Sequence, residues 1–242
     1  MRMQAAGLSA GLTTEQLAAA SSGEKAFMPV AGRPFLDHLL AVLRAAGIED
    51  IGLVVGPRRT VSADVTPVVQ EHPKGTADAV LSARAWAGGE PFLVMNGDNL
   101  YPAAAIEAVA LLDGPGLAGF DRDDLVATSN IPAHRIGAFA VIARDRSWRL
   151  QRILEKPSSA DVDALALPVL VSMNLWRFDA RIFDACRDVK PSTRGELELP
   201  SAVMLARDRG VSFTVVPSAG PVLDLSQRSD IAEVARRLGA TT

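Results

Sequence analysis

The stretch from Pro91 to Leu100 constrains the fold more than any other part of the sequence. An unbroken apolar run, Phe92 to Met95, stops at Asn96-Gly97, and Asp98 follows directly. A short apolar run bounded by turn residues is typical of a strand buried on both faces of a parallel sheet. Ligands of such sheets gather at the carboxyl ends of the strands. The pattern therefore predicts that Asp98 faces a ligand, although Asn-Gly-Asp is also a common turn at the end of a strand.

Strands and helices alternate around this stretch, from Val30 to Leu112. Apolar residues at helical spacing predict a helix from Phe35 to Leu43, which Gly47 ends. Residues 51–56 and 65–69 read as strands, and residues 76–86 and 103–112 as helices. This alternation implies an α/β fold with right-handed crossovers and a mostly parallel sheet.

The second half of the chain has a different order of elements. Residues 137–142 and 150–154 read as paired strands around a polar turn, and residues 169–178, 211–216 and 222–225 as further strands. Helices are expected at 181–187, 197–209 and 229–238. Because no repeat or linker separates these segments, we expect one domain over residues 1–242, with an atypical segment at 1–24.

The composition excludes several classes of protein. Hydrophobic residues make up 48% of the chain, which is enough for a full globular core. A net charge of -3 without a basic run argues against nucleic acid as a partner. No apolar run approaches the roughly 18 residues of a membrane helix. The single cysteine, Cys186, excludes an intrachain disulfide, favours the cytoplasm and reads as a buried thiol rather than a nucleophile.

Further charged residues stand where chemistry is expected. Asp224 lies between apolar residues, so its carboxylate needs a cation or hydrogen-bond donors, as in a metal site, a helix N-cap or a structural ion pair. Glu155-Lys156-Pro157 ends a strand and places two opposite charges side by side, as many solvated surface pairs do. Lys25 precedes a turn bounded by Pro29, a place where a lone lysine is usually unremarkable.

Gln70 and Gly75 suggest a site that reads a base. An amide at the end of a strand offers one acceptor and two donors, which can pair with the edge of a base. Gly75 would let that base approach the backbone closely, although it also suits a plain turn before the helix that starts at Thr76.

Six motifs together resemble the sugar-1-phosphate nucleotidyltransferases, also called NDP-sugar pyrophosphorylases. The closest subgroup is that of the glucose-1-phosphate thymidylyl- and uridylyltransferases. In chain order the motifs are Lys25 to Pro34, Gln70 with Gly75-Thr76-Ala77, Asn96-Gly97-Asp98, Glu155-Lys156-Pro157, Arg194-Gly195-Glu196-Leu197-Glu198 and Asp224. The resemblance implies a three-layer αβα fold around a mixed, Rossmann-like sheet of the GT-A type.

The resemblance also implies an activity, in which a sugar 1-phosphate attacks the α-phosphorus of a nucleoside triphosphate, dTTP or UTP. Catalysis of this kind is mostly positioning and charge neutralisation. The implied metal is Mg²⁺. The implied roles are as follows: Asp98 and Asp224 hold the metal, Lys25 neutralises nucleotide phosphates, Gln70, Gly75 and Thr76 bind the base side, Lys156 binds the sugar phosphate, and Glu155, Gly137 and Asn174 lie against the sugar.

The start of the chain departs from the family pattern. Family members carry an opening strand and a Gly-x-Gly-Thr-Arg loop that binds the triphosphate, whereas Gly7 to Gly11 here contains no cation. Either the segment 1–24 is a truncated or inserted form of that region, or the protein binds a nucleotide sugar or a partner without catalysis. A GT-A glycosyltransferase fits Glu155-Lys156-Pro157 less well. The sequence leaves the oligomeric state open, a homo-oligomer included.

Overall fold

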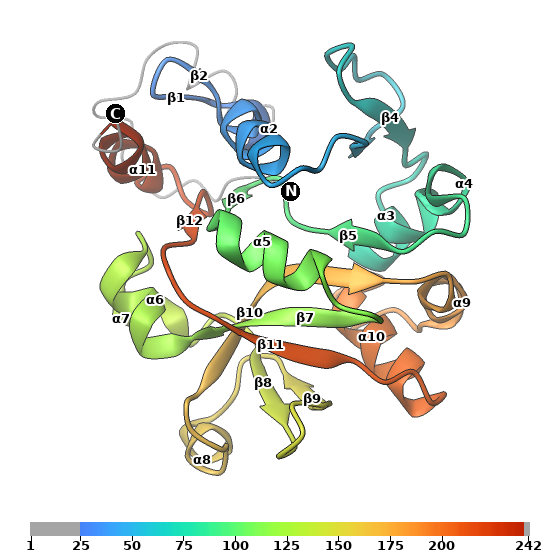
Figure 1. The fold of residues 1–242 in the computed structure, drawn as a ribbon, viewed down its shortest axis with the longest axis vertical. Helices are drawn as coiled ribbons and strands as arrows, with labels where there is room; N and C mark the ends of the chain where they lie inside the picture. Colours follow the sequence, from blue (N-terminus) through green and yellow to red (C-terminus); the bar gives the residue numbers. More distant parts are fainter. Residues whose placement is uncertain (1–24, 240–242) are drawn as a thin grey trace.

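A six-stranded mixed sheet forms the centre of the protein, and the computed structural model describes residues 25–239 of the chain (Figure 1). The strand order is β11-β7-β10-β8-β9, with β5 also paired to β10. The six strands are β5 (Phe92–Val94), β7 (Gly116–Asp121), β8 (Val141–Arg144), β9 (Leu150–Leu154), β10 (Leu170–Phe178) and β11 (Thr214–Ser218). The predicted segment 1–24 lies outside the described residues.

The predicted α/β class with a mixed sheet is confirmed, but its parallel share was overestimated. The long strand β10 pairs antiparallel with β5, β7 and β8, and β8 pairs antiparallel with β9. Among the described pairings, only β11 with β7 and β3 (Gly52–Val55) with β4 (Thr66–Val69) are parallel. All three of these neighbours of the central strand β10 are therefore antiparallel to it.

Helices cover both faces of this sheet, as the three-layer expectation requires. The helices are α2 (Phe35–Ala45), α3 (Thr76–Ser82), α4 (Arg84–Ala87), α5 (Ala103–Ala110), α6 (Arg122–Thr128), α7 (Ala133–Ile136), α8 (Ser159–Asp163), α9 (Arg181–Asp188), α10 (Leu199–Asp208) and α11 (Asp230–Gly239), with a 3-10 turn η1 (Lys25–Phe27) at the start. No helix within residues 25–239 is long and apolar enough to cross a membrane.

Side chains of β10 alternate between two apolar layers, because successive residues of a strand point to opposite faces. Met173 and Leu175 join the layer that contains Ile106 of α5. Trp176 and Phe178 join the opposite layer, which contains the inner residues of α9 and α10. Burying each such side chain stabilises the fold by roughly 1.5–3 kcal/mol.

Strand β7 is a central element that the sequence pattern did not reveal. Its residues include Gly116 and Gly119, which lower the apolar content of the segment. A Cβ atom at Gly116 would lie 2.5 Å from the carbonyl oxygen of Thr214, and one at Gly119 would lie 3.0 Å from Val215. Glycine therefore allows β11 to approach β7 closely. The same glycines interrupt the apolar pattern by which the strand could have been predicted.

Several predicted elements have different bounds in the structure; for example, the strand expected at 211–216 is β11, at Thr214–Ser218. The helix expected at 76–86 is interrupted at Ala83, between α3 and α4. The strand expected at 137–142 begins only at Val141, because α7 occupies residues 133–136 and Gly137 caps that helix.

Candidate active site

Asp98 lies in the turn between β5 and β6 (Asn99–Leu100), beyond the apolar strand. Strand β6 pairs antiparallel with β12 (Leu223–Asp224), so Asn99 is the register partner of Asp224. The backbone N–H of Leu225 also donates to the carbonyl of Asp98, at 3.0 Å. These contacts place the two carboxylates of the predicted metal site next to each other, although they are 126 positions apart in the chain.

Lys25 forms an ion pair with Asp98. Its ammonium nitrogen lies 3.4 Å from Oδ2 of Asp98, and its side chain is 5% exposed. Burial raises the pKa of Asp98, and the neighbouring Asp224 charge raises it further, while Lys25 opposes both. The structure thus brings Lys25, Asp98 and Asp224 into one cluster.

Asp224 is surrounded by donors. Arg135 donates from Nη2 to its Oδ2 at 2.8 Å, and the Asn99 amide donates to Oδ1 at 3.3 Å. Asn130 fixes its backbone, since the Asn130 side chain both donates to the carbonyl and accepts from the N–H of Asp224 at 2.8 Å. Asp224 is therefore held in orientation by three side chains.

The carboxylate pair suits a magnesium ion. Mg²⁺ usually keeps several waters and takes only one or two carboxylates, together with substrate phosphates. Asp98 and Asp224 provide two such oxygen donors, of which Asp224 is buried and Asp98 is 17% exposed. Within residues 25–239 there is no group of three or more His, Cys, Asp or Glu side chains that could hold a metal by itself. The donor set fits a cation that is shared with phosphate.

Gln70, Gly75 and Thr76 form a second cluster. The amide Nε2 of Gln70 donates to the carbonyl of Gly75 at 3.2 Å and to Asp78 at 2.7 Å. Gly75 has a φ of 127°, and a Cβ there would lie 2.4 Å from the carbonyl oxygen of Leu197. Hence Gly75 is required by the close passage of the Leu197 backbone, and this packing role holds whether or not a base binds there.

Glu155 belongs to a third cluster, which includes Glu198 and Arg194. Burial and the neighbouring Glu198 raise the pKa of Glu155. Although burial of Glu198 acts the other way, the hydrogen bond from Arg194 at 2.7 Å lowers the pKa of Glu198. Because Leu197 contacts Gly75 and Glu198 contacts Glu155, the segment 194–198 connects the second and third clusters.

Lys156 and Asn174 share an unusual backbone conformation. Their φ angles are 47° and 58°, in the left-handed region that few residues other than glycine adopt. Asn174 lies where the pairing of β10 with β7 shifts register, between Ser172 and Trp176. Residues with a strained backbone of this kind cluster at functional sites, where the strain is part of the mechanism.

One buried hydroxyl connects the Asp98 turn to this irregular part of β10. Tyr101 donates from its hydroxyl to the carbonyl of Met173 at 2.7 Å and accepts from the N–H of Asn96 at 3.3 Å. Sequence reasoning did not find Tyr101, Arg135, Asn99 or Asn130. Their roles depend on contacts between distant segments, for which the sequence contains no local signal.

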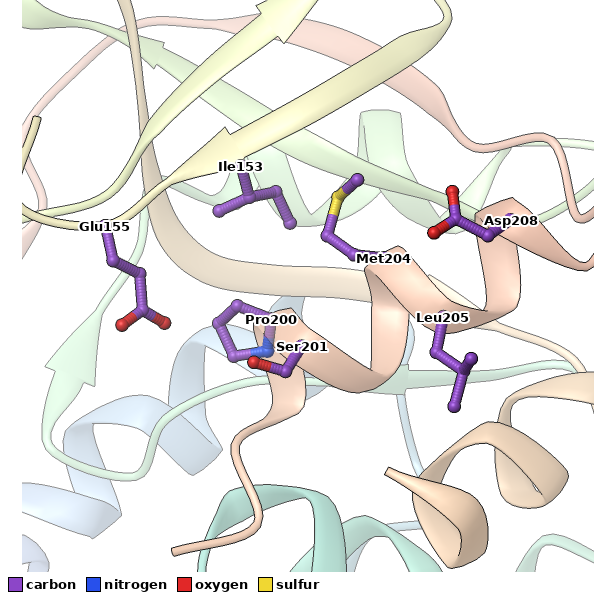
Figure 2. Close-up of a pocket in the computed structure, with 7 residues that line it drawn as sticks. All are labelled: Ile153, Glu155, Pro200, Ser201, Met204, Leu205 and Asp208. Carbon is purple, nitrogen blue, oxygen red and sulfur yellow. The ribbon is translucent and has the colours of Figure 1, made fainter. Parts of the chain in front are cut away.

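A pocket of about 460 Å³ lies between the end of β9 and α10 (Figure 2). Figure 2 shows Glu155 at one end of it and Asp208 at the other. Neither Asp98 nor Asp224 lines this pocket, so it does not define the candidate metal site. The carboxylate pair defines that site, because it carries the chemistry.

Solved structures share this fold. A UTP-bound UGPase from Acinetobacter baumannii has a TM-score of 0.73 at 19% identity, over 96% of this chain and 92% of that one. A UDP-glucose pyrophosphorylase complexed with UDP-glucose has a TM-score of 0.69 at 16% identity, over 90% of this chain and 91% of that one. The chain therefore has the same fold as these two proteins.

The chain belongs to the nucleotidyl transferase family, whose sequence model matches residues 17–236. A glucose-1-phosphate thymidylyltransferase of Streptomyces antibioticus is 29% identical over 97% of this chain and 65% of its own length. The uridylyltransferase AglF of Haloferax volcanii is 26% identical over 99% of this chain and 98% of its own. Several curated relatives are longer, and the chain spans 47% of a bifunctional protein GlmU of Methanococcus vannielii. The predicted family is confirmed.

Proposed function

We propose that this protein transfers a nucleotidyl group from dTTP or UTP to a sugar 1-phosphate, giving an NDP-sugar and pyrophosphate. The observation that carries the proposal is the cluster of Lys25, Asp98 and Asp224 in a member of this family. Curated relatives named glucose-1-phosphate thymidylyl- or uridylyltransferase support both the sugar phosphate and the two pyrimidine nucleotides.

In the proposed reaction a phosphate oxygen of the sugar 1-phosphate bonds to the α-phosphorus of the triphosphate. The bond from that phosphorus to the oxygen that bridges to the β-phosphate breaks, and pyrophosphate leaves with that electron pair. Asp98 and Asp224 would hold Mg²⁺, which neutralises phosphate charge when it is bound. Lys25 adds a fixed positive charge beside Asp98 and lowers the cost of bringing a polyanion into the site.

The other clusters position the two substrates. Gln70, Gly75 and Thr76 bind the base side of the nucleotide, and the Gln70 carbonyl faces the base because its Nε2 is already engaged by Gly75 and Asp78. The sugar phosphate is bound by Lys156, and the sugar hydroxyls by the following groups: Glu155, the Gly137 backbone and Asn174. An ionised Glu155 accepts hydrogen bonds from the hydroxyls. A single domain over residues 1–242 and a cytoplasmic location belong to the same proposal.

The test is a pyrophosphate-release assay with glucose 1-phosphate and each of dTTP, UTP, CTP and GTP in the presence of Mg²⁺. We expect turnover with dTTP or UTP, and a loss of kcat/KM on the order of 100-fold in Asp98→Asn. Asp188→Asn is the matched control, because that carboxylate pairs with Arg209 on the surface. No turnover with any nucleotide, combined with binding of UDP-glucose, would show instead that the protein binds nucleotide sugars without catalysis.

A further inference from the structure

The guanidinium of Arg135 lies between two buried carboxylates. Nη2 is 2.8 Å from Oδ2 of Asp224, and Nη1 is 2.6 Å from Oδ1 of Asp230. The three side chains are 13%, 4% and 6% exposed, respectively. An arginine with one nitrogen on each of two carboxylates is a rigid and directional bridge, because its planar guanidinium fixes both bonds at once.

This bridge joins three elements. Arg135 belongs to α7, Asp224 to β12, and Asp230 is the first residue of α11. Each carboxylate also accepts a backbone bond, from Ser226 N–H at 3.2 Å and from Gln227 N–H at 2.7 Å. These ion pairs and backbone hydrogen bonds therefore fix the connection from β12 to α11 beside the guanidinium.

The charges of the whole cluster are nearly balanced without a metal. Three carboxylates, Asp98, Asp224 and Asp230, face two cations, Lys25 and Arg135. Burial raises the pKa of Asp230, and the hydrogen bond from Arg135 opposes that rise. A buried carboxylate without a partner is expensive, so the arginine offsets the cost of burying both Asp224 and Asp230.

The same arginine opposes a divalent cation at Asp224. It occupies Oδ2, which also accepts from Ser226, while Oδ1 accepts from Asn99. A metal at this carboxylate must share oxygens with those donors, and it meets the repulsion of a fixed positive charge. A metal at Asp224 is therefore favoured only when further negative charge, such as that of phosphate groups, lies beside it.

We infer that Arg135 is a positioning residue of the proposed metal site, which aims Asp224 and lowers the affinity of the free protein for a divalent cation. This inference rests on the proposed function. It implies that the cation is retained together with the phosphates of the nucleotide rather than by the protein alone.

The experiment measures the binding of Mn²⁺ alone to the full chain, through the electron paramagnetic resonance signal of free Mn²⁺. We expect Arg135→Met to bind Mn²⁺ about tenfold or more tightly than the wild type, because a fixed cation beside Asp224 is gone. A variant that is merely destabilised would not gain metal affinity. Arg209→Met is the matched control, since Arg209 pairs with Asp188 away from the site, and we expect it to match the wild type.

A second variant keeps the test decisive if Arg135→Met fails to fold. Arg135→Met combined with Asp230→Asn removes one positive and one negative charge together. Asp224 is then the only carboxylate of the bridge that loses a cationic partner. We expect this double variant to fold and to bind Mn²⁺ more tightly than the wild type. Unchanged or weaker binding in the folded variants overturns the inference about Arg135.

Asp98→Asn separates this inference from the proposed function. Wild-type binding that Asp98→Asn abolishes, with no gain in the Arg135 variants, overturns only the role of Arg135. If Asp98→Asn is added to the Arg135 variants and Mn²⁺ binding does not change, the metal site and the inference are both wrong. The same conclusion follows if no variant binds Mn²⁺.

Discussion

Replacing Tyr101 by phenylalanine removes one oxygen atom that joins two parts of the candidate site. The hydroxyl donates to Met173 O at 2.7 Å and accepts from Asn96 N–H at 3.3 Å, and the residue is 2% exposed. The aromatic ring remains in Tyr101→Phe and continues to pack near Phe120, with ring centroids 6.5 Å apart. The substitution therefore tests the two hydrogen bonds and little else.

The expected loss of stability follows from the groups that are left behind. An unsatisfied buried polar group costs about 1–3 kcal/mol, and the shorter bond to Met173 dominates because the bond from Asn96 is long. We expect a decrease of about 2 kcal/mol in the free energy of unfolding. For a chain of this size that corresponds to a Tm lower by roughly 4–8 °C.

Tyr101→Phe should also lower activity at temperatures where the variant is fully folded. Asn96 leads into the Asp98 turn, and Met173 precedes Asn174 in the irregular part of β10, so both substrate sides lose their common anchor. We expect a higher KM for the sugar 1-phosphate and a lower kcat in the pyrophosphate-release assay, measured well below the Tm.

A core variant next to Tyr101 provides the comparison. Phe120→Leu lowers stability through lost packing but removes no hydrogen bond from the Asp98 turn. If Tyr101→Phe has the Tm and the kinetic constants of the wild type, the hydroxyl does not hold the site. If Phe120→Leu changes KM by the same factor, the effect reports general destabilisation instead.

Three further predictions concern other parts of the molecule. Gly75→Ala should lower the Tm and kcat/KM for the nucleotide, because its Cβ would lie 2.4 Å from the carbonyl oxygen of Leu197, and thermal melts with kinetics measure both. Below its raised pKa Glu155 is protonated, so kcat/KM for the sugar 1-phosphate should fall as the pH decreases through that value. Glu198→Gln removes the facing carboxylate and should move this acid limb of the pH–rate profile to lower pH. Burial raises the pKa of the Cys186 thiol to about 12, so Ellman's reagent at pH 8 should label it only after unfolding.

The sequence predicted those elements whose side chains follow a clear period. The apolar run at Phe92 to Met95 contains strand β5, and the helical spacing from Phe35 to Leu43 is the helix α2. The expectation of a fully buried parallel strand was wrong, because β5 pairs antiparallel with β10 and only Phe92 of it is buried. Strand β7 was missed, because Gly116 and Gly119 are required by neighbouring strands rather than by any local preference. Period and composition therefore identify the elements that bury large side chains, and they fail where close packing requires small ones.

For the candidate site, sequence reasoning found residues but not their partners. Asp98, Asp224 and Lys25 were selected separately, and the structure places them together, while their roles stay predictions. Arg135 gave no signal, since a four-residue helix has no usable period and its partners lie 89 and 95 positions away. Ion pairs between distant segments depend on the fold, so no local pattern in a single sequence predicts them.

The charge balance of the cluster links the stability of the fold to the site. Asp98 has Lys25 as its basic partner, whereas Asp224 and Asp230 share Arg135. If Asp224 is lost, the guanidinium still pairs with Asp230. If Arg135 is lost, two buried carboxylates have no cationic partner. The arginine is therefore the member of the cluster whose removal should cost the fold most. The same position explains why it also opposes a metal, because a guanidinium that stabilises buried Asp224 and Asp230 competes with any further cation at Asp224.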